Sequence, residues 1–403
     1  MLATYLDLTS PSSGTPNEND PAPNNGLSQA VAAAYNKIPT FMSRFSITDA
    51  PSFLRFANDL LTWVPSEGCE GRDIYDVLCM FYFVLGQEPL GSLQARIVPR
   101  GERHMSWLSD WMVVYAQMIG SWMDSGESIT QESLETFWRC GRYNLHEAVV
   151  PEGGFRSFNE FFGRRLREGA RDVEGFGDDE VVVYPADCRL AGDEGSDGGG
   201  GGGIVEVERG GVVRIKGLPW TIGELLGSCG GGEEFEGGIW MHAFLNTYNY
   251  HHVHAPVSGR VIEARKVRGL ACFEVVVDEE EKKPTCRPVE DVARQKEERG
   301  LTAPNTPGYQ FLQTRGVVII ENPLLGKVAV LPVGMAMVSS VRLSVEVGDV
   351  VEKGDEIAGF AFGGSDVVCV FEGRAGLRVE DFVRSPRGEG EWSRYGSVLA
   401  RVP

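Results

Sequence analysis

The distribution of glycine constrains this chain more than any other feature of its sequence. Of the 51 glycines among 403 residues, 10 fall in residues 1–150 and 41 in residues 151–403. Glycine in a helix interior costs roughly 0.5–1 kcal/mol relative to alanine, so the first part can be helical, while the second must be rich in turns, bulges and short strand connections. We therefore expect an α+β protein with a helical N-terminal domain and a β-rich C-terminal domain.

The first 150 residues divide into a polar tail and a helical domain. Residues 1–27 are rich in Pro, Asn and Ser, and we expect them to be disordered. From residue 28 to residue 150, apolar residues recur at steps of three and four, which predicts a bundle of four or five helices. The Trp and Met side chains in this part are interpreted as core rather than as a cofactor site. The clearest helical segments are residues 71–89, 104–125 and 128–143, the last with capping-box spacing between Ser128 and Gln131.

Residues 151–403 are predicted to form a second domain. It opens with a short helix, because Ser157 and Glu160 also have the spacing of a capping box. After residue 180, short runs of alternating and β-branched residues predict strands arranged as a sandwich or barrel with peripheral helices. The segments 192–203, 230–238 and 278–308 are interpreted as surface loops.

Charge and apolar pattern limit the partners of the chain. It carries 38 basic and 57 acidic residues, a formal charge of −19, without a long basic stripe, so we expect no nucleic-acid partner. No run reaches about 18 apolar residues and the N-terminus lacks a basic start, so neither a transmembrane helix nor a signal peptide is expected. The eight cysteines form no CxxC pair, which indicates free thiols. These features favour a cytoplasmic protein without stable membrane insertion.

Three places in the sequence concentrate residues that can do chemistry. Three histidines stand within residues 251–254, and histidine is the side chain that most readily carries protons near neutral pH. Gly363-Gly364-Ser365 places a serine after two residues that permit unusual backbone angles. Asp187 follows an apolar strand, from where its carboxylate could orient a histidine. In chain order, Asp187, His254 and Ser365 would supply an acid, a base and a nucleophile.

Two general classes of hydrolase fit these residues. A serine hydrolase would use them as a triad, although the Gly-x-Ser-x-Gly elbow is absent because Val367 stands at its last position. A zinc hydrolase would use His252 and His254 as a pair of ligands and would need a third ligand, from His242, Asp187 or elsewhere. The residues alone leave both classes open.

Six blocks of residues follow one another between residues 155 and 385: Phe158-Asn159-Glu160-Phe161-Phe162 with Arg165-Leu166, Pro185-Ala186-Asp187, Lys216-Gly217 with Leu225-Leu226-Gly227, Tyr250 to Pro256, Val333-Gly334 with Val338 to Val341, and Gly363-Gly364-Ser365. In these blocks and in their order, the chain resembles the phosphatidylserine decarboxylase family of pyruvoyl-dependent enzymes. The helical part before them resembles the N-terminal domain of fungal members, which include the soluble L-tryptophan decarboxylase.

This resemblance implies that the chain cleaves itself between Gly364 and Ser365. Ser365 would attack the carbonyl of Gly364, with His254 as base and Asp187 orienting it, and the ester would then eliminate. Ser365 would thereby become a pyruvoyl group, a covalent cofactor that needs no metal. Its ketone would form a Schiff base with the substrate amine and accept electrons as CO2 leaves, while His251 handles the proton. The two fragments would stay associated and could form a homo-oligomer.

Three positions depart from the family's pattern, and the least important is Ser339, which stands where glycine is common. His252 stands where the family has arginine, which predicts weaker contact with an anionic headgroup. Asp366 stands where a hydroxylic residue usually follows the serine. Its carboxylate could disfavour self-cleavage through charge on the ester, or could lie near the incoming ammonium group.

The resemblance leaves two substrates. The acidic charge, His252 and the helical domain favour a free, aromatic L-amino acid such as tryptophan, a small molecule in solution. The alternative is phosphatidylserine, which would be converted to phosphatidylethanolamine. An interpretation of another class, a non-catalytic β-rich binding module, is favoured by Asp366.

Overall fold

The computed structural model describes residues 26–99, 105–191, 203–215, 218–228, 232–277, 301–302, 308–337, 340–384 and 392–403. Most of the predicted tail, residues 1–27, and most of the predicted loops 192–203 and 278–308 lie outside this part of the chain. The described elements are helices up to residue 162 and mostly strands from residue 181 onward, which confirms the expected α+β fold.

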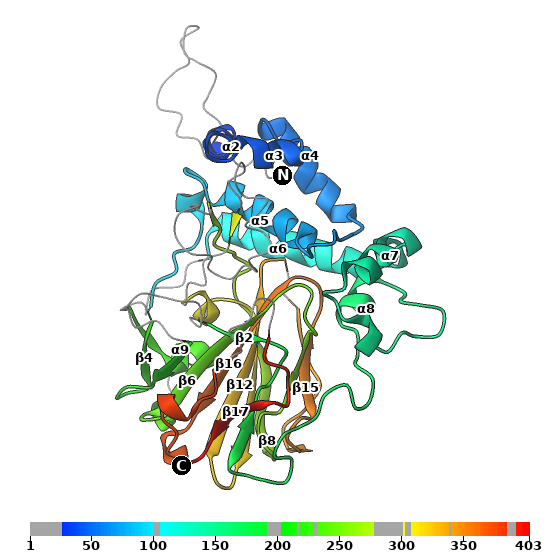
Figure 1. Cartoon of the computed structure of the whole chain (residues 1–403). Helices are drawn as coiled ribbons and strands as arrows, with labels where there is room; N and C mark the ends of the chain where they lie inside the picture. Colours follow the sequence, from blue (N-terminus) through cyan, green and yellow to red (C-terminus); the bar gives the residue numbers. More distant parts are fainter. Residues whose placement is uncertain are drawn as a thin grey trace, which may run out of the picture.

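The N-terminal helices gather at one end of the strands (Figure 1). Three of them cover the segments predicted from the apolar period. The α-helices are α2 (Gly26–Lys37), α3 (Pro39–Arg44), α4 (Ala50–Asp59), α5 (Asp73–Leu85), α6 (Trp107–Met123), α7 (Gln131–Cys140), α8 (Phe158–Phe162) and α9 (Ile222–Leu226). Short 3-10 turns are η1 (Leu60–Thr62), η2 (Gly91–Leu93), η3 (Gly126–Ser128), η4 (Leu145–Glu147), η5 (Glu233–Phe235), η7 (Tyr309–Phe311), η8 (Gly373–Ala375) and η9 (Val379–Asp381).

Side-chain caps fix where the helices begin. The Ser157 hydroxyl accepts a hydrogen bond from the backbone N–H of Glu160 at 3.1 Å, so α8 starts where its sequence predicts. The capping pair predicted for α7 at Ser128 is wrong. The Thr130 hydroxyl instead accepts from the backbone N–H of Ser133 at 3.1 Å, while the buried Ser128 hydroxyl donates to the backbone of the preceding turn. Capping patterns recur along a chain, and tertiary packing decides which one is used.

The strands form one large antiparallel sheet and several small ones. In the large sheet the strands are ordered β14-β8-β11-β12-β16-β6-β2, with β3 also paired to β6. The strands are β1 (Val181–Val183), β2 (Arg189–Leu190), β3 (Ile204–Glu206), β4 (Val212–Ile215), β5 (Leu218–Thr221), β6 (Ile239–Leu245), β7 (His252–His254), β8 (Gly259–Val267), β9 (Val276–Val277), β10 (Leu301–Thr302), β11 (Arg315–Asn322), β12 (Gly326–Met335), β13 (Val341–Leu343), β14 (Val350–Val351), β15 (Glu356–Phe360), β16 (Gly364–Phe371) and β17 (Val398–Arg401).

Both faces of the large sheet are covered. The small sheet β13-β15-β7 shares one apolar core with it, and the hairpin β4-β5 and helix α9 share a second core on the other face. The order of the large sheet begins and ends with different strands, so the described strands form an open, layered sheet. The predicted sandwich therefore holds, and the predicted barrel is wrong.

Strand β16 lies in the middle of the large sheet, so both of its faces are buried. Successive side chains of a strand point to opposite faces. Val367 and Cys369 accordingly pack in the core shared with β13-β15-β7, while Val368 and Val370 pack in the other core. This alternation assigns a face to every residue of β16, including the first ones.

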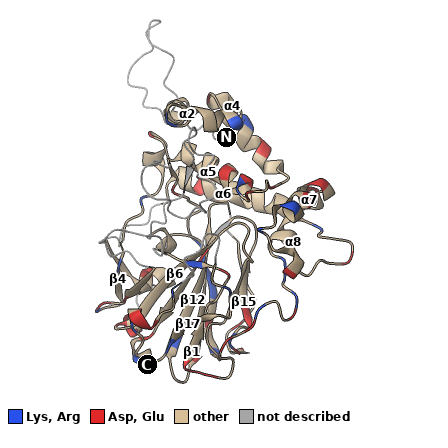
Figure 2. Cartoon of the chain, viewed as in Figure 1, with Lys and Arg blue, Asp and Glu red and all other residues tan. Residues whose placement is uncertain are grey.

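The positions of the charged residues and the apolar length of the helices can be followed in the described part of the chain. Figure 2 shows Lys and Arg dispersed over helices and strands among the residues it colours, rather than gathered on one element. None of the helices in the described part of the chain combines the length and the apolar character that crossing a membrane requires.

Candidate active site

Ser365 lies at the start of β16, between β12 and β6. It pairs with Gly334 on one side and with Leu245 on the other. By the alternation along β16, its side chain faces the core shared with β13-β15-β7. Ser365 is wholly buried, and its hydroxyl has no hydrogen-bond partner among the described residues. A buried hydroxyl without a partner is unusual in a folded protein and is a mark of functional sites.

The segment before Ser365 is held by helix α8. The backbone N–H of Phe362 donates to the side-chain oxygen of Asn159 at 2.7 Å. The Phe362 ring packs edge-on against Phe158 and Phe162, with centroids 5.3 and 5.6 Å away, and against Trp63 from the N-terminal helices at 5.8 Å. Gly363 then takes a φ of 137°, a conformation that L side chains rarely adopt. The backbone at the expected scission point is thus fixed from both parts of the chain.

His251 lies just before β7 and is bound to the same unit. Its ring centroid lies 4.0 Å from that of Phe162, with the planes tilted by 32°, and its carbonyl accepts from the N–H of Phe360 at 3.0 Å. Nδ1 lies 2.8 Å from the carbonyl of Asn249, which can only accept, so Nδ1 carries the proton and Nε2 is the bare nitrogen. Nε2 has no partner. Burial, together with the positive charge of Arg164, lowers the pKa of His251 well below its usual value, so the ring is neutral at pH 7.

His254 is buried among tyrosines at the end of β7. Its Nδ1 donates to the carbonyl of Gly354 at 2.7 Å, and its Nε2 accepts from the hydroxyl of Tyr250 at 3.1 Å. The ring stacks on Tyr395 with centroids 3.8 Å apart and planes at 3°. Burial lowers the pKa of His254 to about 4, so this ring is also neutral at pH 7.

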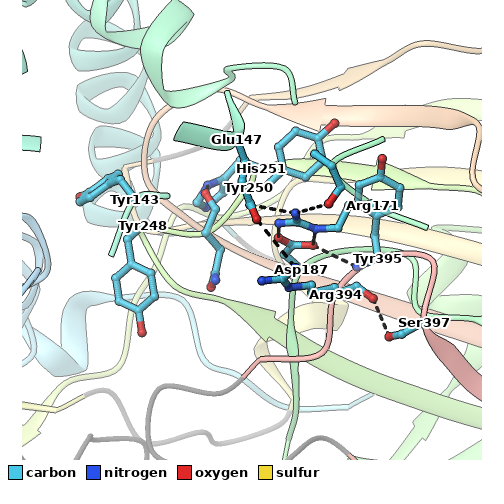
Figure 3. A network of polar contacts seen from close by, with 12 residues as sticks. Tyr143, Glu147, Arg171, Asp187, Tyr248, Tyr250, His251, Arg394, Tyr395 and Ser397 are labelled. Carbon is cyan, nitrogen blue, oxygen red and sulfur yellow. Dashed lines mark hydrogen bonds and ion pairs between the residues drawn. The ribbon is translucent and has the colours of Figure 1, made fainter. Parts of the chain in front are cut away.

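Asp187, expected to orient His254, is held mainly by an arginine. Nε and Nη2 of Arg171 donate to its two oxygens at 3.2 and 2.5 Å, and the backbone N–H of Tyr395 donates to Oδ1 at 3.0 Å. Figure 3 shows Arg171 joined in this way to both Asp187 and Glu147. Asp187 and His254 therefore meet through Tyr395, which binds the carboxylate and stacks on the imidazole, rather than through a direct hydrogen bond.

The predicted site residues fall into two neighbouring groups. Ser365 and His251 belong to the unit built on α8, and Asp187 and His254 belong to the Arg171–Tyr395 network. The pairing of β15 with β7 joins the groups, because Gly359 pairs with His252 and Glu356 with His254. The hydrogen bonds of the described residues do not link Ser365 to either histidine, so the roles of these four side chains remain predictions.

Asp366 faces away from the scission point. It follows Ser365 on β16, so its side chain points to the opposite face of the sheet. There its Oδ2 accepts from the hydroxyl of the partly buried Tyr309 at 2.5 Å and from Nε2 of the wholly buried His242 at 2.8 Å. The Asp366 side chain therefore fits neither of the two effects considered from the sequence. These effects were charge on the ester and contact with an ammonium group at Ser365.

His252 joins strand to helix instead of forming a metal site. Its Nε2 donates to the carbonyl of Gly163 at 3.0 Å, and its Nδ1 lies 3.2 Å from Oε1 of Glu356. Although burial would raise the pKa of Glu356, contact with His252 and with Ser344 lowers it to about 2. The described residues contain no group of three or more His, Cys, Asp and Glu suited to hold a metal.

A pyruvoyl group made from Ser365 fits this place. The serine hydroxyl has no competing hydrogen bond, the preceding backbone has a glycine where φ is positive, and the bare Nε2 of His251 belongs to the same packed unit. Sequence reasoning missed Arg171, Tyr395 and Asn159 as the groups that hold these residues. Asn159 stands inside a block that was recognised, whereas nothing in the sequence marks Tyr395.

Known proteins resemble this chain in sequence over its C-terminal part. The family model described as phosphatidylserine decarboxylase matches residues 158–396, more than half of the chain. The phosphatidylserine decarboxylase proenzyme 3 of Schizosaccharomyces pombe is 29% identical over 259 residues, which cover 64% of this chain and 23% of the relative. The proenzyme 2 of Oryza sativa subsp. japonica is 31% identical over 269 residues, covering 66% and 37%. The proenzyme of Fusobacterium nucleatum is 25% identical over 307 residues, covering 76% and 86%. The chain thus matches only about a quarter and about a third of the first two relatives.

Proposed function

Because the chain belongs to the phosphatidylserine decarboxylase family, we propose that it is a self-processing, pyruvoyl-dependent decarboxylase that acts on phosphatidylserine. The observation that carries the proposal is the buried, unpartnered hydroxyl of Ser365 directly after Gly364, inside the region that the family model matches. A serine in this state has no structural hydrogen bond to maintain and is free to react.

Self-cleavage follows from the position of this hydroxyl. The oxygen of Ser365 attacks the carbonyl carbon of Gly364 while a base takes its proton, and the C–N bond then breaks with proton return to nitrogen, leaving an ester. Loss of the α-proton of Ser365 expels the carboxylate of Gly364, and addition of water with loss of ammonia leaves a ketone on the C-terminal fragment. His254, neutral at pH 7, is the proposed base, positioned by the Tyr395–Asp187 network.

The pyruvoyl group supplies an electron-withdrawing ketone to an amine-bearing substrate, so that its carboxylate can leave as CO2. The protein residues have to bind the substrate and manage its protons. His251 suits the second task, because its bare Nε2 is buried, neutral and free of other hydrogen bonds. On substrate binding, Nε2 takes a proton from the substrate's ammonium group, and it returns this proton to the carbon that has lost CO2.

The substrate is proposed from the names of the relatives. The three relatives described above are named phosphatidylserine decarboxylase proenzymes, and none supports the free aromatic amino acid expected from the sequence. One structural observation keeps the amino acid as a second candidate. Trp63 of the N-terminal helices packs on Phe362, two positions before Gly364, so this part of the chain places an aromatic side chain near the scission point.

The substrate experiment compares the two candidates on the same preparation. Processed protein is incubated with phosphatidylserine in mixed micelles and, separately, with free tryptophan, tyrosine, phenylalanine and serine. Release of CO2 and formation of phosphatidylethanolamine only in the lipid arm are the expected result. Turnover of tryptophan without turnover of lipid would transfer the proposal to the second candidate. A Ser365→Ala preparation is the control for contaminating activity.

A further inference from the structure

Arg164 is a buried cation without an anionic partner. It is 3% exposed, and its Nη2 donates to the carbonyls of Tyr143 and Tyr248 at 2.9 Å and of Asn249 at 3.4 Å. Within the described part of the chain, its Nε and Nη1 have no hydrogen-bond partner, and no carboxylate forms an ion pair with it. Burial lowers its pKa only to about 10, so it stays charged at neutral pH. A buried charge of this kind is costly unless an anion joins it.

The guanidinium belongs to the unit that surrounds the scission point. It shares the Asn249 carbonyl with the ring of His251, whose own carbonyl is bound by the N–H of Phe360. Arg164 also stands two residues after the end of helix α8, which holds Phe362 through Asn159. Arg164 and the segment that is cut are therefore joined through His251 on one side and helix α8 on the other.

Scission creates a carboxylate in this place. Before the cut there is none, because Gly364 is bonded to Ser365, and after it the N-terminal fragment ends in Gly363-Gly364 with a free carboxylate. We propose that Arg164 receives this new C-terminal carboxylate of Gly364, an assignment that rests on the proposed self-cleavage. Two glycines let the terminus turn freely, and four residues beyond Phe360 span up to roughly 13 Å. A bidentate pair would occupy the two N–H groups that the uncut chain leaves open.

The carboxylate of a substrate is the other source of the same chemistry. An ion pair there would favour the charged ground state over a transition state in which the carboxylate loses its charge, and so would slow decarboxylation. An arginine placed to bind the leaving group would thus work against the reaction. The new carboxylate of Gly364 takes no part in decarboxylation, so an ion pair with it does not slow the reaction. Binding this carboxylate to Arg164 would also keep it away from the reactive end of the C-terminal fragment.

The test measures how well the new terminus is held. Full-length Arg164→Met, Arg164→Lys and wild type are allowed to process, then treated under native conditions with a carboxypeptidase, and the N-terminal fragment is followed by intact mass. Arg165→Met is the matched control, since its side chain is 74% exposed on the next residue. We expect Arg164→Met to lose Gly364 and Gly363 about ten-fold or more faster than wild type, Arg164→Lys to be intermediate, and Arg165→Met to match wild type.

Each other result decides against the proposal. Equal trimming of wild type and Arg164→Met overturns it, and a raised KM for substrate with equal trimming would assign Arg164 to the substrate carboxylate instead. Failure of both Arg164 variants to process would place the side chain in folding or scission, before the carboxylate exists, and would also overturn it. A wild type that remains one chain would refute the proposed function itself, which intact mass shows before any carboxypeptidase is added.

Discussion

Ser365 and His251 share a property that distinguishes them from Asp187 and His254. Each is wholly buried, and each has one polar side-chain atom that no neighbour satisfies. The two nitrogens of His254, in contrast, are both occupied. Leaving a buried polar group unpaired costs about 1–3 kcal/mol, so such atoms persist where chemistry uses them. The hydroxyl of Ser365 is thus suited to attack, and Nε2 of His251 to exchange a proton with substrate.

Replacing His251 should separate the two reactions. In His251→Gln we expect self-cleavage to go to completion and decarboxylation to fall by about 100-fold or more, the usual contribution of a general acid or base. His252→Gln is the matched control, because the ring of His252 contacts the carbonyl of Gly163 and the carboxylate of Glu356, whereas Nε2 of His251 lacks such a contact among the described residues. Electrophoresis follows the first reaction and CO2 release the second. Loss of self-cleavage in His251→Gln would contradict the division of roles.

The pKa of His254 predicts how self-cleavage depends on pH. Because burial holds this pKa near 4, below the usual 6.5, the ring remains an unprotonated base through the whole range from pH 5 to 8. The rate of scission in freshly synthesised chain should therefore be flat over that range and fall only as pH approaches 4. A fall with a midpoint near pH 6.5 would show a base with an ordinary histidine pKa.

Asp366 should matter for stability more than for scission. Asp366→Ala removes the acceptor of Tyr309 and His242 and should lower the free energy of unfolding by about 1–3 kcal/mol, because two buried donors lose their partner. Asp366→Asn keeps an acceptor and should lose less. Both variants should still cut themselves, as seen by electrophoresis beside a thermal melt. An uncut but folded Asp366→Asn would place the carboxylate in the scission chemistry.

At the scale of elements, helix α8 is the clearest link between sequence and site. The five-residue helix begins at its serine cap, and its aromatic side chains pack on the segment before Ser365. Asn159 adds hydrogen bonds to the carbonyl of Gly120 at 3.2 Å and to Asp124 at 2.9 Å on the N-terminal side. One side chain therefore ties helix α6 and the following turn to the scission segment.

Asn159→Ala should slow self-cleavage. It frees the N–H of Phe362 and loosens the backbone that must approach the Ser365 hydroxyl, and loss of such positioning can cost about ten-fold or more in rate. Glu160→Ala is the control on the same helix, since Glu160 pairs only with the exposed Arg156. The time course of fragment appearance on a denaturing gel gives both rates. Equal rates in the two variants would contradict the positioning role.

The sequence predicts local features of the fold better than long-range ones. The apolar period located α5, α6 and α7, and the Ser157 cap located α8, because these signals lie within a few residues of each other. The open edges of the large sheet follow from strand pairings far apart in the chain, and no local pattern distinguishes them from a barrel. The site shows the same limit. Asp187 was recognised in its block, but its partners Arg171 and Tyr395 reach it from other elements.

At the scale of the molecule, the N-terminal helices cover the end of the sheet where Ser365 lies. Trp63 contacts Phe362, and Tyr75 and Tyr82 meet Phe273 edge-on with centroids 6.4 and 5.8 Å away. Glu67, four residues after Trp63, is buried and accepts hydrogen bonds from the hydroxyl of Tyr143 and from the backbone N–H of Asp73. Access to Ser365 therefore depends on how stably the N-terminal helices pack on this end of the sheet.

The buried carboxyl of Glu67 should make the stability of the N-terminal helices depend on pH. Burial raises its pKa from 4.5 to about 7, so the stabilisation it provides is complete below pH 4.5 and is lost as pH rises through 7. Glu67→Gln should remove this loss, gaining roughly 2–3 kcal/mol over wild type between pH 5 and pH 8. Chemical unfolding at both pH values measures the difference. A constant difference between the two proteins would contradict a raised pKa.

The central claim is that the bond between Gly364 and Ser365 breaks without help and converts the serine. Intact mass spectrometry of freshly purified, active protein tests it most directly. We predict fragments of residues 1–364 and 365–403, the smaller one lighter by one ammonia than the same peptide with an N-terminal serine, and a single chain in Ser365→Ala. Active wild-type protein consisting only of the uncut 403-residue chain would contradict the account.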